Sequence, residues 1–174
     1  MPKLPRPSLK RSDKETERDA FGDPVAGPVL TVRTILALLL FVGGVAWIVY
    51  YYLGVRPTDG WGSINLDTGE ENPAGGPKFM RDLENWNYAI GFGLVVLGLI
   101  VSAHRATPMG RGRGVVVGML GCFLFGLIWI CTYYVVGTTD PPKDVPVFND
   151  LEQKNLIVGI VFMAVGFVFA TKWE

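Results

Sequence analysis

Charged residues are scarce in this sequence, and they are missing entirely from four long stretches. Only 18% of its 174 residues are Asp, Glu, Lys or Arg, while 49% are hydrophobic. Such a composition is too apolar for an ordinary soluble domain and for a disordered chain. The 16 basic residues are balanced by 16 acidic ones, so no basic excess points to nucleic-acid binding. The composition therefore indicates a membrane protein.

Residues suited to redox, metal or acid–base chemistry are also few. His104 is the single histidine, which excludes bis-histidine haem ligation and a histidine-rich metal site. Cys122 and Cys131 are nine residues apart on one predicted helix, so they face opposite sides and cannot pair with each other. The four charge-free stretches lack the intramembrane ionisable groups of pumps, ion-coupled carriers and voltage sensors. We therefore expect no catalytic site, cofactor, metal or small-molecule substrate, and no enzyme.

The charge-free stretches predict an all-α membrane protein with four transmembrane helices. A helix needs roughly 20 apolar residues to cross about 30 Å of hydrocarbon, and the last stretch is near the lower limit. None of the stretches alternates like the strand of a membrane barrel. The predicted spans are about 35–55, 86–103, 114–136 and 155–172.

The charges themselves predict the orientation. One side of the predicted spans holds 11 basic and 6 acidic residues, and the other side holds 5 basic and 10 acidic residues. By the positive-inside rule, both termini and the turn 105–113 face the cytoplasm. The outer loop 56–85, rich in Gly, Pro and acidic residues, is predicted to be a flexible connector.

The N-terminal tail, residues 1–33, is predicted to be disordered. It mixes charges with five prolines and few large apolar residues, so it cannot bury enough surface to offset its chain entropy. Two roles are open for this tail. It either sets topology and solubility, or binds lipid headgroups or a cytoplasmic partner.

The chain contains an internal repeat. The first span aligns with the third at an offset of 82 residues, and the second aligns with the fourth at an offset of 68. Each copy is predicted to be a helical hairpin, residues 34–104 and 114–174, and both copies begin in the cytoplasm, so the repeat is parallel. The matched pairs include Trp47 and Trp129, Gly44 and Gly126, Leu83-Glu84 and Leu151-Glu152, Asn87 and Asn155, Gly91 and Gly159, and Gly98 and Gly166.

Glycines within these spans form stripes. In the second and fourth spans two glycines are seven residues apart, which places them on nearly the same face of the helix. In the third span glycines recur at multiples of four residues. Such stripes of small residues allow two helices to approach closely. Two interpretations are open, packing within the hairpin or a groove for the helix of a partner protein. The candidate packing and partner-contact residues are Trp86, Asn87, Gly91, Gly98, Gly118, Gly126, Asn155, Gly159 and Gly166, and the candidate interface anchors are Trp47, Trp129 and Trp173. Trp86 and Asn87 are expected to cap and anchor the second span.

Several short motifs stand at matching places in the chain. They are Met1-Pro2-Lys3, Asn85-Trp86-Asn87, Ile90-Gly91-Phe92-Gly93 and the terminal Thr171-Lys172-Trp173-Glu174. Together they resemble the CrgA family of actinobacterial cell-division membrane proteins, whose members are usually single two-span hairpins. Here the pattern is spread over two copies. The second copy has Lys154 where the first has Trp86, and the terminal motif occurs only in the second.

The resemblance implies a non-enzymatic scaffold or regulator of septation. Such a protein would lie in the cell membrane, enriched at the septum, and contact division-ring proteins and septal peptidoglycan synthases through its spans and tail. A further hypothesis is that the second hairpin packs against the first and replaces a homodimer of single hairpins. An accessory subunit of a large membrane complex, such as a respiratory oxidase, is the alternative, and a small transporter or channel is disfavoured by the missing intramembrane charges.

Overall fold

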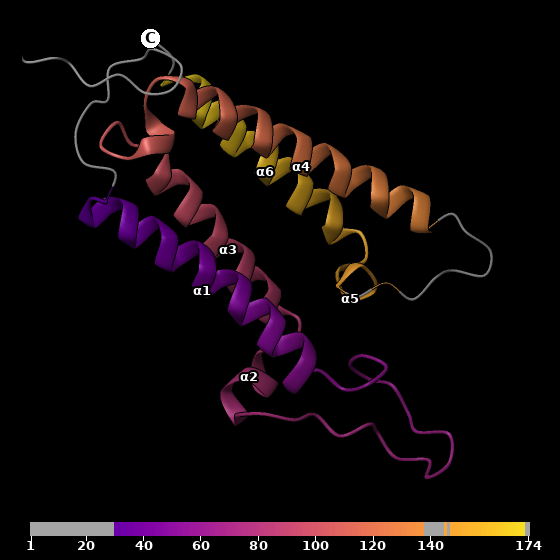
Figure 1. The fold of residues 1–174 in the computed structure, drawn as a ribbon. Helices are drawn as coiled ribbons and strands as arrows, with labels where there is room; N and C mark the ends of the chain where they lie inside the picture. Colours follow the sequence, from indigo (N-terminus) through magenta and orange to yellow (C-terminus); the bar gives the residue numbers. More distant parts are fainter. Residues whose placement is uncertain (1–29, 138–144, 146, 173–174) are drawn as a thin grey trace, which may run out of the picture.

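The computed structural model describes residues 30–137, 145 and 147–172 (Figure 1). The predicted disordered tail, apart from residues 30–33, and the candidate anchor Trp173 lie outside the described residues. The helices are α1 (Val32–Gly54), α2 (Lys78–Leu83), α3 (Trp86–Ser102), the 3₁₀ turn η1 (Pro108–Gly110), α4 (Arg113–Gly137), α5 (Phe148–Leu151) and α6 (Lys154–Ala170). The long elements in this part of the chain are helices, as expected, and its extended pairing is limited to an isolated bridge between Ile64 and Glu71.

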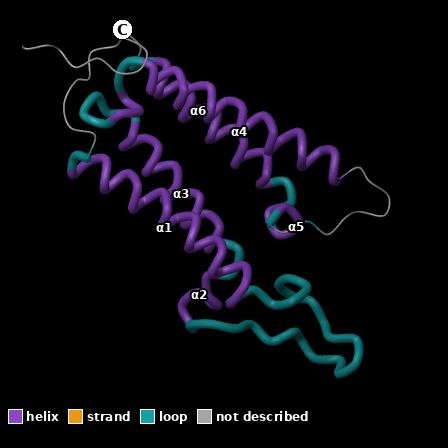
Figure 2. Tube along the Cα trace, viewed as in Figure 1, coloured by secondary structure: helices purple, strands orange, loops and turns teal. Residues whose placement is uncertain are grey.

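The four long helices form two hairpins. Helix α1 packs along α3, and α4 packs along α6, while α3 also touches α6 between the hairpins. We call the end that holds residues 103–112 the inner end and the opposite end, with α2 and α5, the outer end. Figures 1 and 2 show that the axes of the two hairpins diverge from the inner end toward the outer end. Helices α1 and α4 are long and apolar enough to cross a membrane, and the apolar helices α3 and α6 have 17 residues each.

Glycines bring the helix backbones together in the same way in both hairpins. A methyl group at Gly44 would lie 2.6 Å from the carbonyl oxygen of Gly91, and one at Gly126 would lie 2.5 Å from the carbonyl oxygen of Gly159. Both distances are too short for a real side chain, so these positions hold only a hydrogen atom. The matched glycines of the repeat therefore make matched contacts.

A short helix precedes the second long helix of each hairpin, and a glutamate separates the two. Glu84, between α2 and α3, has φ of 44°, and Glu152, between α5 and α6, has φ of 47°. A positive φ is strained for a residue with a side chain and persists only where surrounding contacts hold it. The Leu-Glu pairs of the sequence repeat thus mark the same break in both copies.

The outer loop between α1 and α2 is folded, whereas the sequence predicts a flexible connector. The backbone N–H of Asn65 donates to the carbonyl oxygen of Glu70 at 2.8 Å, and the N–H of Asn72 donates to that of Ser63 at 3.0 Å. The side-chain amide of Asn72 adds a 3.0 Å bond to the Ser63 hydroxyl. Asparagine and serine side chains that hydrogen-bond nearby groups stabilise such turns despite the many glycines.

Candidate functional site

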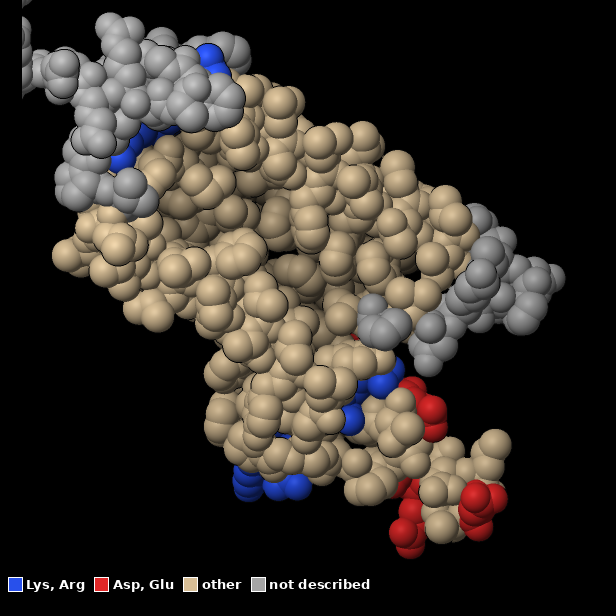
Figure 3. Space-filling model, viewed as in Figure 1, with Lys and Arg blue, Asp and Glu red and all other residues tan. Residues whose placement is uncertain are grey.

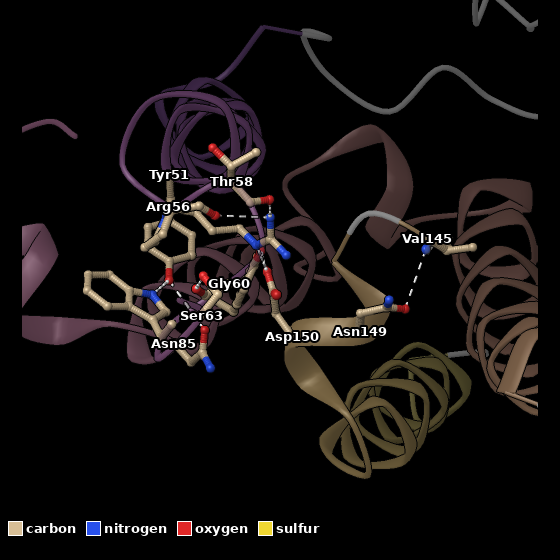
Figure 4. Close-up of polar contacts among 12 residues, drawn as sticks. Tyr51, Arg56, Thr58, Gly60, Ser63, Asn85, Val145, Asn149 and Asp150 are labelled. Atoms are coloured by element: carbon tan, nitrogen blue, oxygen red, sulfur yellow. Dashed lines mark hydrogen bonds and ion pairs between the residues drawn. The ribbon is translucent and has the colours of Figure 1, made fainter. Parts of the chain in front are cut away.

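Six polar or amphipathic side chains gather at the outer end, where α5 of the second hairpin reaches the first hairpin (Figure 4). We call them the outer polar cluster, and they are Tyr51, Arg56, Trp61, Asn85, Tyr88 and Asp150. Five come from the first hairpin and its loop, and Asp150 comes from α5 of the second hairpin. The cluster therefore joins segments that are far apart in the sequence.

An ion pair connects the two copies within this cluster. The Nε atom of Arg56 donates to Oδ2 of Asp150 at 2.5 Å, and only 9% and 7% of the two side chains are exposed. The hydroxyl of Tyr88 donates to the same oxygen at 2.6 Å. Burial lowers the pKa of Arg56, but the hydrogen bond and the negative charge of Asp150 outweigh this effect and raise the pKa. Asp150 therefore favours the charged form of Arg56.

The cluster also pins the start of the outer loop to the helices. Nη1 of Arg56 donates to the carbonyl oxygen of Thr58 at 2.9 Å. The indole N–H of Trp61 donates to the hydroxyl of Tyr51 at 2.7 Å, and that hydroxyl donates to Oδ1 of Asn85 at 3.3 Å. The loop is thereby tied to both helices of the first hairpin (Figure 4).

Apolar packing lies directly beneath these polar contacts. Leu151 of the second hairpin is 5% exposed and sits in a core cluster with Tyr51, Val55, Met80 and Tyr88 of the first. The rings of Tyr51 and Tyr88 meet edge to face, with centroids 4.9 Å apart. Apolar burial and the ion pair therefore hold the same junction.

The arrangement suits a structural junction. The Asp150 oxygen that would act as a base already accepts two hydrogen bonds. Within the part of the chain that the structure describes, no group of three His, Cys, Asp or Glu side chains could hold a metal ion. What these contacts can do is hold one hairpin against the other.

The inner end is held by contacts between the start of α1 and the turn after α3. The guanidinium of Arg33 hydrogen-bonds the imidazole of His104, and the hydroxyl of Thr31 donates to the carbonyl oxygen of Ala106 at 3.4 Å. The hydroxyl of Thr107 donates to the carbonyl oxygen of His104 at 2.7 Å. The turn therefore packs against the first hairpin as an ordered segment.

The candidate glycines face helices of their own hairpin. Methyl groups at Gly91 and Gly159 would strike an isoleucine of α1 and α4 respectively, and one at Gly98 would lie 2.8 Å from backbone atoms of α1. Gly118 lies under the ring of Phe169 from α6. This geometry favours packing within each hairpin over a groove for a partner helix.

Asn87 and Asn155 are fully buried and occupy matched positions. The side-chain amide of Asn87 donates to the carbonyl oxygens of Met80 and Glu84 at 2.7 and 2.8 Å, and Asn155 makes the same two bonds to the matched residues of its own copy. An N-terminal cap would instead accept from backbone N–H groups. The expectation that Asn87 caps the second span is therefore wrong, because the side chain stabilises the preceding break.

The candidate tryptophans lie in different surroundings. Trp86 is 73% exposed at the outer start of α3. The indole nitrogens of Trp47 and Trp129 are buried and have no hydrogen-bond partner in the described part of the chain. Trp129 instead contacts aromatic rings, stacking on Phe148 with centroids 4.4 Å apart and meeting Phe92 of the first hairpin edge to face at 5.5 Å.

Two apolar grooves run between the hairpins. The α1–α4 groove has a volume of about 530 Å³, is floored by α3 and extends from Met109 at the inner end to Val147 at the outer end. The α3–α6 groove has a volume of about 620 Å³, and Glu84 and Lys154 are the charged residues among those that line it. Both grooves arise because the hairpin axes diverge.

Sequence reasoning missed the outer polar cluster. A usable signal is that Asp82 and Asp150 precede the matched Leu-Glu pairs at the same offset of 68 residues. That alignment does not reveal that Asp150 meets Arg56, because the partner depends on how the hairpins pack. The copies also differ where it matters, since Tyr88 is matched by Leu156.

Comparisons with known proteins give the same division into two copies. A family model described as cell division protein CrgA matches residues 1–105 and again residues 102–174. The chain is 38% identical to a cell division protein CrgA of Streptomyces avermitilis over 56 residues, which cover 32% of this chain and 60% of that relative. It is 32% identical to one of Corynebacterium glutamicum over 77 residues, covering 44% and 63% respectively. The matches thus span less than two thirds of these relatives, and no solved structure matches the chain.

Proposed function

Because this chain belongs to the CrgA family of cell division proteins, we propose that it is a multi-pass membrane scaffold or regulator of septation, and not an enzyme. The observation that carries the proposal is the family match over both copies. The relatives are named for cell division, so they give no support to the alternative of an oxidase accessory subunit. The activity proposed here is binding through helix faces and the tail.

Four membrane spans fit the fold best. Only 11% of the apolar window of α1 and 22% of that of α4 is buried, so they are unlike core helices of a soluble protein, and large exposed apolar surfaces are typical of membrane contact. Helices α3 and α6 rise about 26 Å over 17 residues, close to the thickness of the hydrocarbon core. Figure 3 shows an uncharged band between charged residues at the two ends.

The positive-inside rule orients this bundle with the inner end in the cytoplasm. In that orientation the outer polar cluster and the folded loop face the outside, and the N-terminal tail is cytoplasmic. The proposed partners are division-ring proteins, reached through the tail and inner turn, and septal peptidoglycan synthases, reached through the spans.

A localisation experiment tests the proposal. A fluorescent fusion to the full chain should concentrate at the division septum, and crosslinking in the membrane should capture ring and synthase proteins. A uniform membrane signal throughout the division cycle, with capture of haem-containing subunits, would overturn the septal role. The triple variant Gly44→Leu/Gly126→Leu/Asp150→Ala, which should disrupt the bundle, is the matched loss-of-function control.

A further inference from the structure

The α1–α4 groove has the dimensions of a lipid chain. Its wall on α4 runs from Val117 to Trp129, a rise of about 18 Å, whereas one membrane leaflet supplies about 15 Å of hydrocarbon. Its lining is almost wholly apolar. The groove is therefore long enough to hold the whole length of an acyl chain that enters at the inner end.

The groove volume of about 530 Å³ accommodates an acyl chain. A methylene group is about as large as a water molecule, roughly 30 Å³, so a chain of ordinary length fits. Gly121 keeps part of the wall open, because a methyl group there would meet no atom within 4 Å.

Basic residues gather at the inner end of the bundle, where this groove begins at Met109. Arg33 lies in the first turn of α1, and Arg111 and Arg113 lie between Met109, which lines the groove, and the rest of α4. The segment 101–114 contains Arg105 as well and no acidic residue. Anionic headgroups are attracted to such basic clusters at the cytoplasmic surface. The two charged residues that line the α3–α6 groove, Glu84 and Lys154, lie instead at the outer end.

We propose that the α1–α4 groove binds an anionic phospholipid of the inner leaflet, with one acyl chain along α4 and the phosphate against the arginines of the inner end. This binding rests on the proposed topology and is independent of the proposed role in septation. It gives the space between the hairpins a specific occupant.

Lipid retention measured by native mass spectrometry tests the groove. The full chain is taken from nanodiscs that hold equal amounts of phosphatidylglycerol and phosphatidylcholine with the same acyl chains. The wild type should retain one phosphatidylglycerol, and Gly121→Leu should lose it. Gly43→Leu and Gly93→Leu should both retain it, because each position is also open but the first lines neither groove and the second lines the α3–α6 groove.

A second blocking variant guards against a folding defect in Gly121→Leu. Val117→Phe adds bulk to the same wall from a side chain that is already 65% exposed, and it should also lose the lipid while the helical content stays unchanged. If both blocking variants retain as much phosphatidylglycerol as Gly43→Leu, the groove assignment is wrong. It is equally wrong if they keep the lipid but lose a crosslinked partner protein.

Charge neutralisation tests the headgroup contact. Arg111→Gln/Arg113→Gln should retain the two lipids equally, whereas Lys78→Gln/Arg81→Gln, which changes two exposed charges of α2 at the outer end, should keep the preference for phosphatidylglycerol. Equal retention of both lipids by the wild type would refute the headgroup contact. Reporter fusions in the turn 105–113 and in the outer loop test the topology separately, so that failure of lipid binding and failure of the topology or the septal role are distinguishable.

Discussion

The two hairpins share their helix-to-helix contacts and differ in their outer polar groups. In both, a glycine of the first helix meets a glycine of the second, and an asparagine stabilises the break before the second helix. At the outer end, however, Asp150 is buried in an ion pair, whereas the matched Asp82 is exposed. The contacts that set the distance between the two helix backbones of a hairpin tolerate little change. At the outer end the two copies differ in sequence, and there the second copy contacts the first.

The strongest test of this difference replaces the two matched aspartates. Asp150→Ala should lower the free energy of unfolding by about 3–5 kcal/mol, because it leaves the buried charge of Arg56 without its partner. Asp82→Ala should change it by less than about 0.5 kcal/mol, as is usual at an exposed site. Unfolding in detergent, followed by circular dichroism, measures both values.

A double variant separates the ion pair from general damage. Arg56→Leu/Asp150→Leu removes both charges and should recover much of the lost stability, because buried pairs are often replaced by apolar residues at little cost. If Asp150→Ala and Asp82→Ala have equal small effects, the outer polar cluster does not hold the hairpins together.

The shared glycine contacts predict equal effects in the two copies. Gly44→Leu and Gly126→Leu should each cost about 3 kcal/mol, since a side chain would strike backbone atoms of the facing helix. Gly43→Leu is the control, because a methyl group at this neighbouring position meets nothing within 4 Å. The measurement is again thermal unfolding in detergent. Tolerance of Gly126→Leu but not Gly44→Leu would show that only the first hairpin depends on close packing.

Removing the hydroxyl of Tyr88 tests the difference between the two copies by the loss of one oxygen atom. Tyr88→Phe removes the 2.6 Å hydrogen bond to Asp150 and should cost about 1.5 kcal/mol, the usual range for a hydrogen bond to a charged group. The loss is smaller than for Asp150→Ala because Arg56 keeps its partner. Tyr50→Phe, at a side chain that is 53% exposed, should have no measurable effect. If Tyr50→Phe lost as much stability as Tyr88→Phe, the hydrogen bond within the outer polar cluster would not explain the loss.

The matched asparagines should again contribute equally in the two copies, but with a smaller effect on stability. Asn87→Ala and Asn155→Ala each remove two hydrogen bonds to backbone carbonyls, but also remove a buried side-chain oxygen that has no partner in the described residues. The net cost should be about 1 kcal/mol in each copy. The exposed Gln153→Ala is the control in the same melting experiment. A cost confined to one copy would mean that the two breaks are not equivalent.

The shared features were predictable from sequence, and the junction was not. The long apolar helices, the hairpins and the glycine contacts follow from charge-free stretches and from Gly91 and Gly98 recurring on one helix face, because these are local properties of a helix. The pairing of Arg56 with Asp150 joins residues 94 positions apart. It depends on the angle between the hairpins, which no local pattern encodes. The short helices α2 and α5 were missed for a related reason, since six and four residues are too few for periodicity.

The smallest expected difference in stability between the copies concerns a position at which both copies have glycine. A methyl group at Gly98 would lie 2.8 Å from backbone atoms of Ala37 and Phe41, whereas one at Gly166 would lie 3.2 Å from the nearest atom of α4. Gly98→Ala should therefore cost about 1 kcal/mol more than Gly166→Ala. Cys131→Ala, at an exposed side chain, is the control in the same thermal unfolding experiment. Equal costs would mean that the first hairpin relaxes as easily as the second, and would leave the outer polar cluster as the difference between them.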